Sequence, residues 1–286
     1  MDYVRNIYSK IGDPQNKNKE KSVNDLFEIN LNENKLNTNL IVKVIEGTNE
    51  IHIYNKETKK LEKHKVELNV KKLNTKVFYK GCKSALVNGK VYISGGKDFS
   101  GDKTLFLVYN INEKKISRLH DMKYPRSFHS FYHHASMKAL LAIGGENNNS
   151  CELYDFYLNM WNDFPELNYA RANVEIIMNS NATLAYSLFG INGDIIKKQL
   201  SDVVEVIDMI DLNKGWYRVE YKNNTGVDVK SNCMTIYPLP DDKLLLFGGL
   251  EQRNPHPVYL VFDLKKLEMT KCDLMHAEKL KNNSLH

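Results

Sequence analysis

The densest group of titratable side chains lies in PRSFHSFYHH, residues 125 to 134, which contains Arg126, His129, His133 and His134. Three histidines so close together raise the question of a metal site, because neutral imidazole is a common metal ligand. No cysteine or carboxylate accompanies them at ligand spacing, and a strand would point His133 and His134 to opposite faces. We therefore expect no metal site here, and a structural or surface role for these side chains.

The chain also lacks the sequence motifs of other kinds of catalytic site. The chain contains no GxSxG nucleophile elbow, no P-loop and no HExxH zinc motif. No pair of carboxylates is set apart by its spacing or by an apolar setting. We therefore expect a protein that is not an enzyme and that needs no cofactor.

The composition favours one large domain, because 286 residues with 42% hydrophobic side chains can bury a substantial core. Forty lysines and arginines against 35 aspartates and glutamates give a net charge of +5. The basic residues cluster at 56 to 65 and 71 to 76 without interleaved aromatic side chains, which argues against nucleic-acid binding.

The cellular setting follows from two absences. No apolar stretch is long enough for a signal peptide or a membrane span, so we expect a cytoplasmic protein without a membrane partner, with cytoskeletal association as one alternative. The four cysteines are far apart and form no CxxC pair, which favours buried thiols in a reducing compartment.

Internal repetition is the informative feature of the chain. A short apolar run ends in glycine at intervals of 48, 49, 46 and 58 residues, at Gly47, Gly95, Gly144, Gly190 and Gly248. Each unit also contains two large side chains seven positions apart, separated by a polar turn: Tyr54 and Leu61, Tyr109 and Ile116, Tyr154 and Trp161, Met209 and Trp216, Phe262 and Met269. Apolar runs around a polar turn predict a hairpin. Four strands in a repeat of roughly 50 residues predict one blade of a propeller.

The segment AIGGENNNSCELYDFYLNMW, residues 142 to 161, resembles the Kelch motif. A diglycine closes an apolar strand and is followed by a tyrosine and then a tryptophan; the other units keep part of this pattern. The resemblance implies an all-β fold, a Kelch-type β-propeller of five to six four-stranded blades over residues 22 to 275. A Lys-rich segment would precede it at 1 to 21, and a tail or closing strand would follow at 276 to 286.

The repeat residues have a packing interpretation. The glycines would let neighbouring backbones approach closely, and the aromatic side chains would fill the space between blades while their polar atoms bond to a nearby loop. These structural residues are Gly95, Gly96, Tyr109, Gly144, Gly145, Tyr154, Trp161, Trp216, Gly248 and Gly249.

Two blade counts fit the N-terminal region. The runs at 26 to 31, 40 to 46, 50 to 55 and 61 to 69 can form one blade, which gives five. Alternatively, residues 26 to 36 form the outer hairpin of an earlier blade whose first strands come from the C-terminus, which gives six and leaves fewer exposed strand edges. We favour six.

The resemblance also implies where a partner would bind, since Kelch loops at the blade junctions and after the diglycine commonly form the binding face. Arg126 and His129 resemble the junction Arg and His of many Kelch repeats, and Arg171 matches in the next unit. We predict a partner-binding face that includes these three residues and, in the long loop LEQRNPHPVY, Arg253 and His256. The insertion at 192 to 205 is a further candidate. Alternatively, a junction arginine bonds only to neighbouring loop carbonyls.

On this basis we expect a scaffold or adaptor that is monomeric on its own and binds an unidentified protein. The alternatives are a substrate receptor for a ubiquitin ligase, recruited through a separate partner chain, and a structural subunit of a cytoskeletal or ciliary assembly. A Kelch-type oxidase ranks last, because the chain offers no convincing equivalent of the copper-binding tyrosines and histidines of those enzymes.

Overall fold

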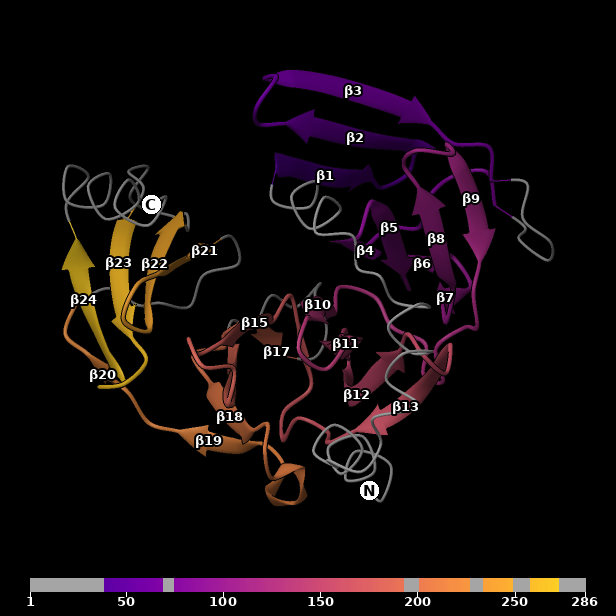
Figure 1. The fold of residues 1–286 in the computed structure, drawn as a ribbon. Coiled ribbons are helices and arrows are strands. Elements are labelled where there is room, and N and C mark those ends of the chain that lie inside the picture. The colour runs from indigo at the N-terminus through magenta and orange to yellow at the C-terminus, as the bar shows by residue number, and fades with distance from the viewer. Residues whose placement is uncertain (1–38, 69–74, 193–200, 227–233, 249–257, 273–286) are drawn as a thin grey trace, which may run out of the picture.

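The computed structural model describes residues 39–68, 75–192, 201–226, 234–248 and 258–272. These residues form five large sheets, antiparallel except at one outer pair in the last, that follow one another around a central axis (Figure 1). We call them blades 1 to 5 in chain order. The first strands of neighbouring blades, β1, β4, β10 and β15, contact one another and therefore lie nearest the axis.

The strands have the following bounds. Blade 1 contains β1 (Leu40–Ile45), β2 (Glu50–Asn55) and β3 (Lys60–Lys65); blade 2, β4 (Lys83–Val87), β5 (Lys90–Ser94), β8 (Phe106–Asn110) and β9 (Lys115–Arg118); blade 3, β10 (Ser130–His134), β11 (Ala139–Gly145), β12 (Asn148–Asp155) and β13 (Met160–Phe164). Blade 4 contains β15 (Glu175–Met178), β16 (Leu184–Leu188), β18 (Val204–Asp208) and β19 (Tyr217–Val219); blade 5, β20 (Lys222–Asn223), β21 (Met234–Leu239), β22 (Lys243–Gly248), β23 (Val258–Asp263) and β24 (Glu268–Cys272). Two small ladders complete the described strands: β6 (Lys97–Asp98) with β7 (Gly101–Asp102), and β14 (Arg171–Ala172) with β17 (Ile191–Asn192).

The hydrophobic core is divided into layers between the blades. Separate clusters of buried side chains lie between blades 1 and 2, 2 and 3, 3 and 4, and 4 and 5. Strand β11 of blade 3 is buried along its whole length because neighbours cover both of its faces, and it has the continuous apolar sequence ALLAIGG. The lysine-rich strand β3 lies at the outer edge of blade 1 and is mostly exposed.

The predicted hairpins are confirmed in all five repeats, because the two strands that flank each turn pair as antiparallel neighbours. In four of them, cross-strand register pairs the two large residues of the unit, as in Tyr154 with Trp161 of blade 3 and likewise in blades 1, 2 and 5. In blade 4 the hairpin is present, but Met209 and Trp216 do not pair across it, because Val206 lies opposite Tyr217 and the turn contains a 3-10 helix, Leu212–Lys214. Trp216 lies immediately before the fourth strand of blade 4, β19, and is buried as Trp161 is.

The first two diglycines contact the backbone of the connection that leads into the next blade. The amide of Gly96 donates a hydrogen bond to the carbonyl oxygen of Arg126 at 2.9 Å. Gly95 has a φ of +62°, and a Cβ added to it would collide with that same carbonyl. At Gly144, where φ is +64°, the added Cβ would lie 2.9 Å from the carbonyl oxygen of Arg171. A side chain at Gly95 or Gly144 would therefore displace the loop that leads into the next blade.

The repeated aromatic residues join neighbouring segments. Both tryptophans are nearly fully buried. The indole N–H of Trp161 donates to the carbonyl oxygen of His120 at 3.0 Å, and that of Trp216 donates to the carbonyl oxygen of Pro165 at 2.9 Å. In blade 2 the hydroxyl of Tyr109 lies 2.7 Å from Nδ1 of His64, which is in blade 1.

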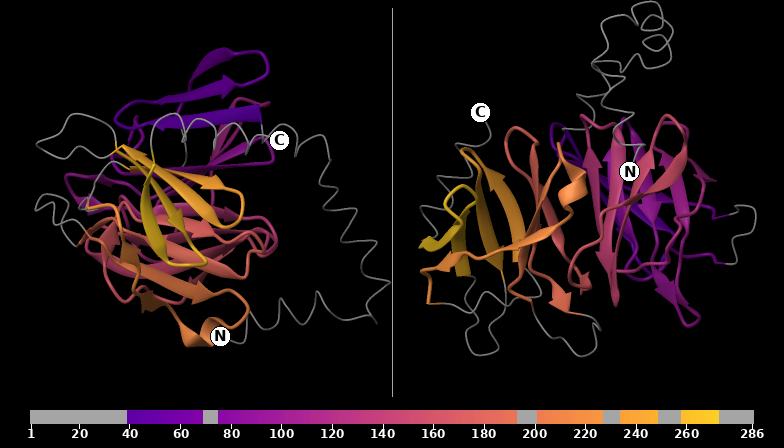
Figure 2. Two further views of the ribbon diagram at one scale, coloured as in Figure 1. Left: turned by 90° about the vertical axis from the view of Figure 1, so that its left-hand side faces the viewer. Right: turned by 90° about the horizontal axis from the view of Figure 1, so that it is seen from below.

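The blades differ in strand number from the expected four. Blade 1 has three described strands, whereas blade 5 has a fifth, because β20 pairs in parallel with β24 along its outer edge. Residues 26 to 36, on which the six-blade alternative depends, lie outside the described residues, as do the proposed domain boundaries and Gly249. Two further views show the five described blades from the side and from below (Figure 2).

Three cysteines fall in the described part of the chain, and none of them forms a disulfide bond there. Cys82 and Cys151 are buried, and burial raises the pKa of each thiol to about 12, so both stay protonated at neutral pH. Cys272 is half-buried, and Cys233 lies outside the described residues. No helix within the described ranges is long and apolar enough to cross a membrane.

Candidate functional site

The propeller has two unlike faces. Because successive strands of a blade are antiparallel, the turns between its first and second and its third and fourth strands lie at one end, which we call the turn face. The connections between the second and third strands, and those from one blade to the next, lie at the other end, the loop face. Long connections such as residues 95–105 and 119–129 lie on the loop face.

The structure corrects the prediction that Arg126, His129 and Arg171 are part of an exposed binding surface, because all three side chains are fully buried. The guanidinium group of Arg126 donates hydrogen bonds to the carbonyl oxygens of Gly144 and Ser150, each at 2.8 Å. The alternative interpretation, in which a junction arginine bonds to loop carbonyls, describes these contacts. A partner bound at the surface cannot touch these side chains.

Each buried arginine is neutralised by a buried glutamate. Arg126 pairs with Glu152 at 2.7 Å, and Arg171 pairs with Glu205 at 2.5 Å. Arg171 also repeats the carbonyl contacts of Arg126, donating to the carbonyl oxygen of Phe189 at 2.7 Å. A buried charge without its counter-charge is strongly destabilising. Removing one residue of a pair should therefore destabilise the protein more than replacing both residues together.

The two glutamates also hold the connections that enter their blades. The carboxylate of Glu152 accepts hydrogen bonds from the backbone N–H groups of Lys123 at 2.6 Å and Tyr124 at 3.2 Å. Glu205 accepts from the backbone N–H of Asn168 at 2.7 Å. The sequence interpretation missed both residues. Their signal is a carboxylate inside an apolar strand, in CELY and VVEVI.

Blade 2 shows the alternative to this ion pair. The N–H of Phe128 donates to the carbonyl of Gly81, and in the same way the N–H of Asn173 donates to the carbonyl of Phe128. Gly81, Phe128 and Asn173 therefore occupy equivalent positions in successive repeats. Arg126 and Arg171 lie two residues before Phe128 and Asn173, respectively. The residue two positions before Gly81 is Tyr79. The strand register places Leu107 where blades 3 and 4 have their glutamates. Blade 2 thus replaces the ion pair with two largely apolar side chains.

His129 is buried with its Nε2 atom 2.8 Å from the hydroxyl of Ser94. Burial, and then the nearby charges of Arg126 and Lys83, hold the pKa of its imidazole well below the ordinary value. The folded protein therefore keeps His129 neutral at a pH where the unfolded chain would protonate it. Because the unfolded state then binds more protons, stability is lost as the pH falls below about 6.5.

We accordingly expect acid to weaken the fold before the carboxylates titrate. The loss due to His129 approaches about 1.4 kcal/mol per pH unit below pH 6.5. Urea unfolding at pH 7.5 and pH 5.5 measures it, and the variant His129→Gln should show a shallower dependence on pH. The same dependence in the variant and the original protein would assign the acid sensitivity to other groups.

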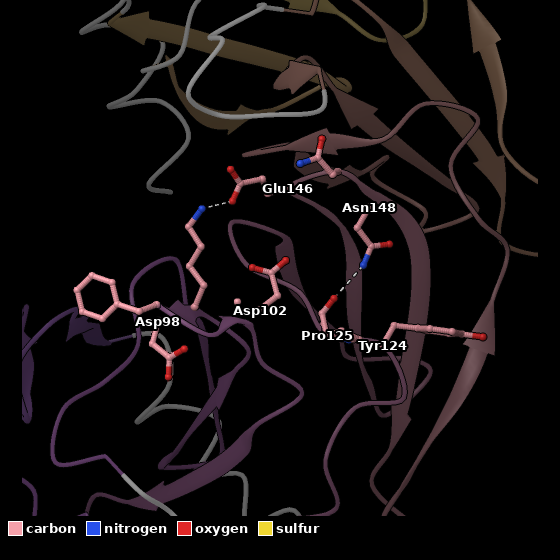
Figure 3. A pocket seen from close by; sticks show the side chains of 10 residues that line it. Asp98, Asp102, Tyr124, Pro125, Glu146 and Asn148 are labelled. Carbon is pink, nitrogen blue, oxygen red and sulfur yellow. Dashed lines mark hydrogen bonds and ion pairs between the residues drawn. The ribbon is translucent and has the colours of Figure 1, made fainter.

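An open groove lies on the loop face between blades 2 and 3, with a volume of about 680 Å³ (Figure 3). Ligand-binding pockets commonly measure about 300 to 1,000 Å³. Three connections line the groove: the β6–β7 hairpin, the segment that joins blade 2 to blade 3, and the β11–β12 turn. The side chains that define its character are Asp98, Phe99, Asp102, Tyr124, Glu146 and Asn148.

Contacts between these connections fix the walls of the groove. The side-chain amide of Asn148 donates to the carbonyl oxygen of Pro125 at 3.1 Å, and Lys97 forms an ion pair with Glu146 across the two blades (Figure 3). The segment that contains Tyr124 is fixed by the hydrogen bond from the Tyr124 backbone N–H to the buried Glu152 carboxylate. The groove is therefore built before any ligand arrives.

The rim of the groove is aromatic. Phe99, at the tip of the β6–β7 hairpin, is fully exposed, and Tyr124 is 41% exposed. Beside Phe99, hydrogen bonds from the Lys103 ammonium and from Ser100 lower the pKa of Asp98 to about 2. Exposed aromatic side chains beside fixed polar groups are typical of protein-binding surfaces.

The sequence interpretation did not single out these lining residues. It identified the connections after the diglycines as a binding face, but named the later loops. Arg253, His256 and residues 193–200 lie outside the described residues, and the last two residues of the proposed insertion, 204 and 205, belong to strand β18 (Val204–Asp208). The available signal was the segment KDFSGDKTL that follows Gly96, which is long, charged and has one large aromatic side chain.

His133 and His134 lie on adjacent positions of β10, and burial lowers the pKa of both imidazoles. The ring of His134 accepts a hydrogen bond at Nδ1 from the backbone N–H of Met137 at 3.2 Å. Across the described ranges, no three histidine, cysteine or acidic side chains gather closely enough to hold a metal ion.

The repeat pattern and the arrangement of its blades define a Kelch-type β-propeller. No protein-family profile matches the sequence. Among curated proteins, the chain is similar to Kelch-like protein 41a of Danio rerio, with 30% identity over 162 residues. The match covers 54% of this chain and 26% of the relative, so it spans about a quarter of that protein's length.

Proposed function

We propose that this propeller is a non-catalytic protein-interaction module that binds a segment of a partner protein in the groove between blades 2 and 3. The observation that carries the proposal is the groove itself, which is preformed, open at the loop face and rimmed by exposed aromatic side chains. The buried Arg126–Glu152 pair and the contacts between the three connections hold its walls, and preorganised walls reduce the entropic cost of binding.

The similarity to a Kelch-like protein supports the same proposal, as does the position of the groove at the loops that follow the diglycines. In this role Arg126 and Arg171 are positioning residues that shape the loop face from inside. Phe99 and Tyr124 are the groove side chains that a partner would meet first.

Site-specific photocrosslinking in the native cells tests the proposal. A benzoylphenylalanine replaces Phe99, which is fully exposed, or Ile210, which is 72% exposed in a turn of the opposite face. We expect a defined protein to crosslink at position 99 and not at position 210, and both variants to melt as the original protein does, since exposed substitutions change stability by less than about 0.5 kcal/mol. Equal crosslinking at both positions, or crosslinking at 210 alone, would place the interaction elsewhere.

A further inference from the structure

We infer that the groove between blades 2 and 3 recognises a basic side chain, most favourably arginine, presented by an extended segment of another protein. The inference rests on the proposed function and specifies the chemistry of the partner. It follows from three features of the groove: how its charges are paired, what surrounds the remaining charge, and where the aromatic surfaces lie.

The groove contains one cation, which is already engaged. The ammonium of Lys97 pairs with Glu146 and lies 5.3 Å from the centre of the Phe128 ring. Outside the groove lining, the ammonium of Lys103 pairs with Asp98 at 2.7 Å. These contacts neutralise two of the three carboxylates that line the groove, Glu146 and Asp98.

The third carboxylate, Asp102, remains available. Its Oδ1 atom accepts a hydrogen bond from the hydroxyl of Ser127 at 2.8 Å. Within the described residues its side chain has no ion pair, and its other oxygen has no hydrogen bond. Figure 3 shows Asp102 near the centre of the groove, between Asp98 and Pro125. A carboxylate held in this way can accept further hydrogen bonds from a cation.

The surroundings suit the stem of a long basic side chain. Phe99, in the β6–β7 hairpin, and Tyr124, in the segment that joins blade 2 to blade 3, offer exposed aromatic rings from two different connections that line the groove. Arginine combines a planar donor group for carboxylates with a surface that stacks on aromatic rings, and is more weakly hydrated than lysine. A nucleic-acid phosphate or an acidic peptide would instead be repelled by Asp102.

The test is a selection from a random dodecapeptide library displayed on phage, performed on the full chain. We expect the selected peptides to be enriched in arginine and lysine. Fluorescence anisotropy with one selected peptide should show binding at least about tenfold weaker in Asp102→Asn, since a hydrogen bond to a charged group is worth that factor. The same loss should follow when citrulline replaces the arginine of the peptide. Selection on Asp102→Lys should favour acidic peptides instead.

Two controls separate this inference from the proposed function. Asp102→Asn keeps an oxygen that can accept from Ser127, so it should melt as the original protein does, and Asp163→Asn removes an exposed carboxylate outside the groove and should bind normally. Peptides that need Phe99 but are indifferent to Asp102→Asn would overturn the basic-segment inference alone. Peptides indifferent to both Phe99→Ser and Asp102→Asn, or no selected peptides at all, would overturn the groove as a binding site.

Discussion

Replacing Glu152 by leucine should destabilise the protein by about 3 to 5 kcal/mol, because the guanidinium group of Arg126 would remain buried without its counter-charge. Neither side chain of this pair has any exposed surface, so water cannot take over the role of the carboxylate. Arg171→Leu, which strands Glu205 in the next blade, should have a similar effect. Urea unfolding at neutral pH measures both losses.

The decisive comparison is the double variant Arg126→Tyr with Glu152→Leu, which copies the residues found in blade 2. Replacing a buried ion pair by well-packed apolar side chains is often neutral or stabilising, so the double variant should recover most of the stability lost in Glu152→Leu. If the double variant is as unstable as Glu152→Leu, the carboxylate matters mainly through its bonds to the backbone of Lys123 and Tyr124. If Glu152→Leu melts like the original protein, the ion pair has no structural role.

The blades could be predicted from the sequence because their packing repeats along the chain. Each blade buries its apolar strands against a neighbour in the same way, so the same residue types return at a near-constant interval, as at Gly95 and Gly144. The pairing of Tyr154 with Trp161 follows from the length of one hairpin turn. Where the turn changes, as before Trp216, the spacing no longer identifies the partner.

The candidate site could be predicted only in outline. The sequence brings the loops that follow the diglycines to one end of the blades, the end at which the groove lies, since alternation of antiparallel strands decides which loops meet there. It does not reveal that Arg126 points inward, because the glutamate that neutralises it stands 26 residues further along the chain. Nor does it bring Asp102, Tyr124 and Asn148 into one groove, which depends on the path of three irregular connections.

Trp161→Ala should cost about 3 to 5 kcal/mol, the usual loss when a buried tryptophan is truncated. The Trp161 side chain is only 3% exposed, and its ring centre lies 4.9 Å from that of Phe106 in blade 2 and 5.3 Å from that of Tyr154 in its own blade. Its indole also satisfies the carbonyl of His120. Trp161→Phe keeps most of the packing and should lose about 1 to 3 kcal/mol, chiefly through that carbonyl.

The effect should be local as well as large. In a repeat array each unit contacts only its neighbours, and the contacts of Trp161 are confined to blades 2 and 3. Hydrogen exchange should therefore show a greater loss of amide protection in those two blades than in blade 5. Tyr157→Ala, which changes a 68% exposed side chain in the adjoining turn, is the matched control and should leave the melt unchanged. An unchanged melt in Trp161→Ala would contradict the packing role, and equal loss of protection in every blade would mean that the propeller opens as one cooperative unit.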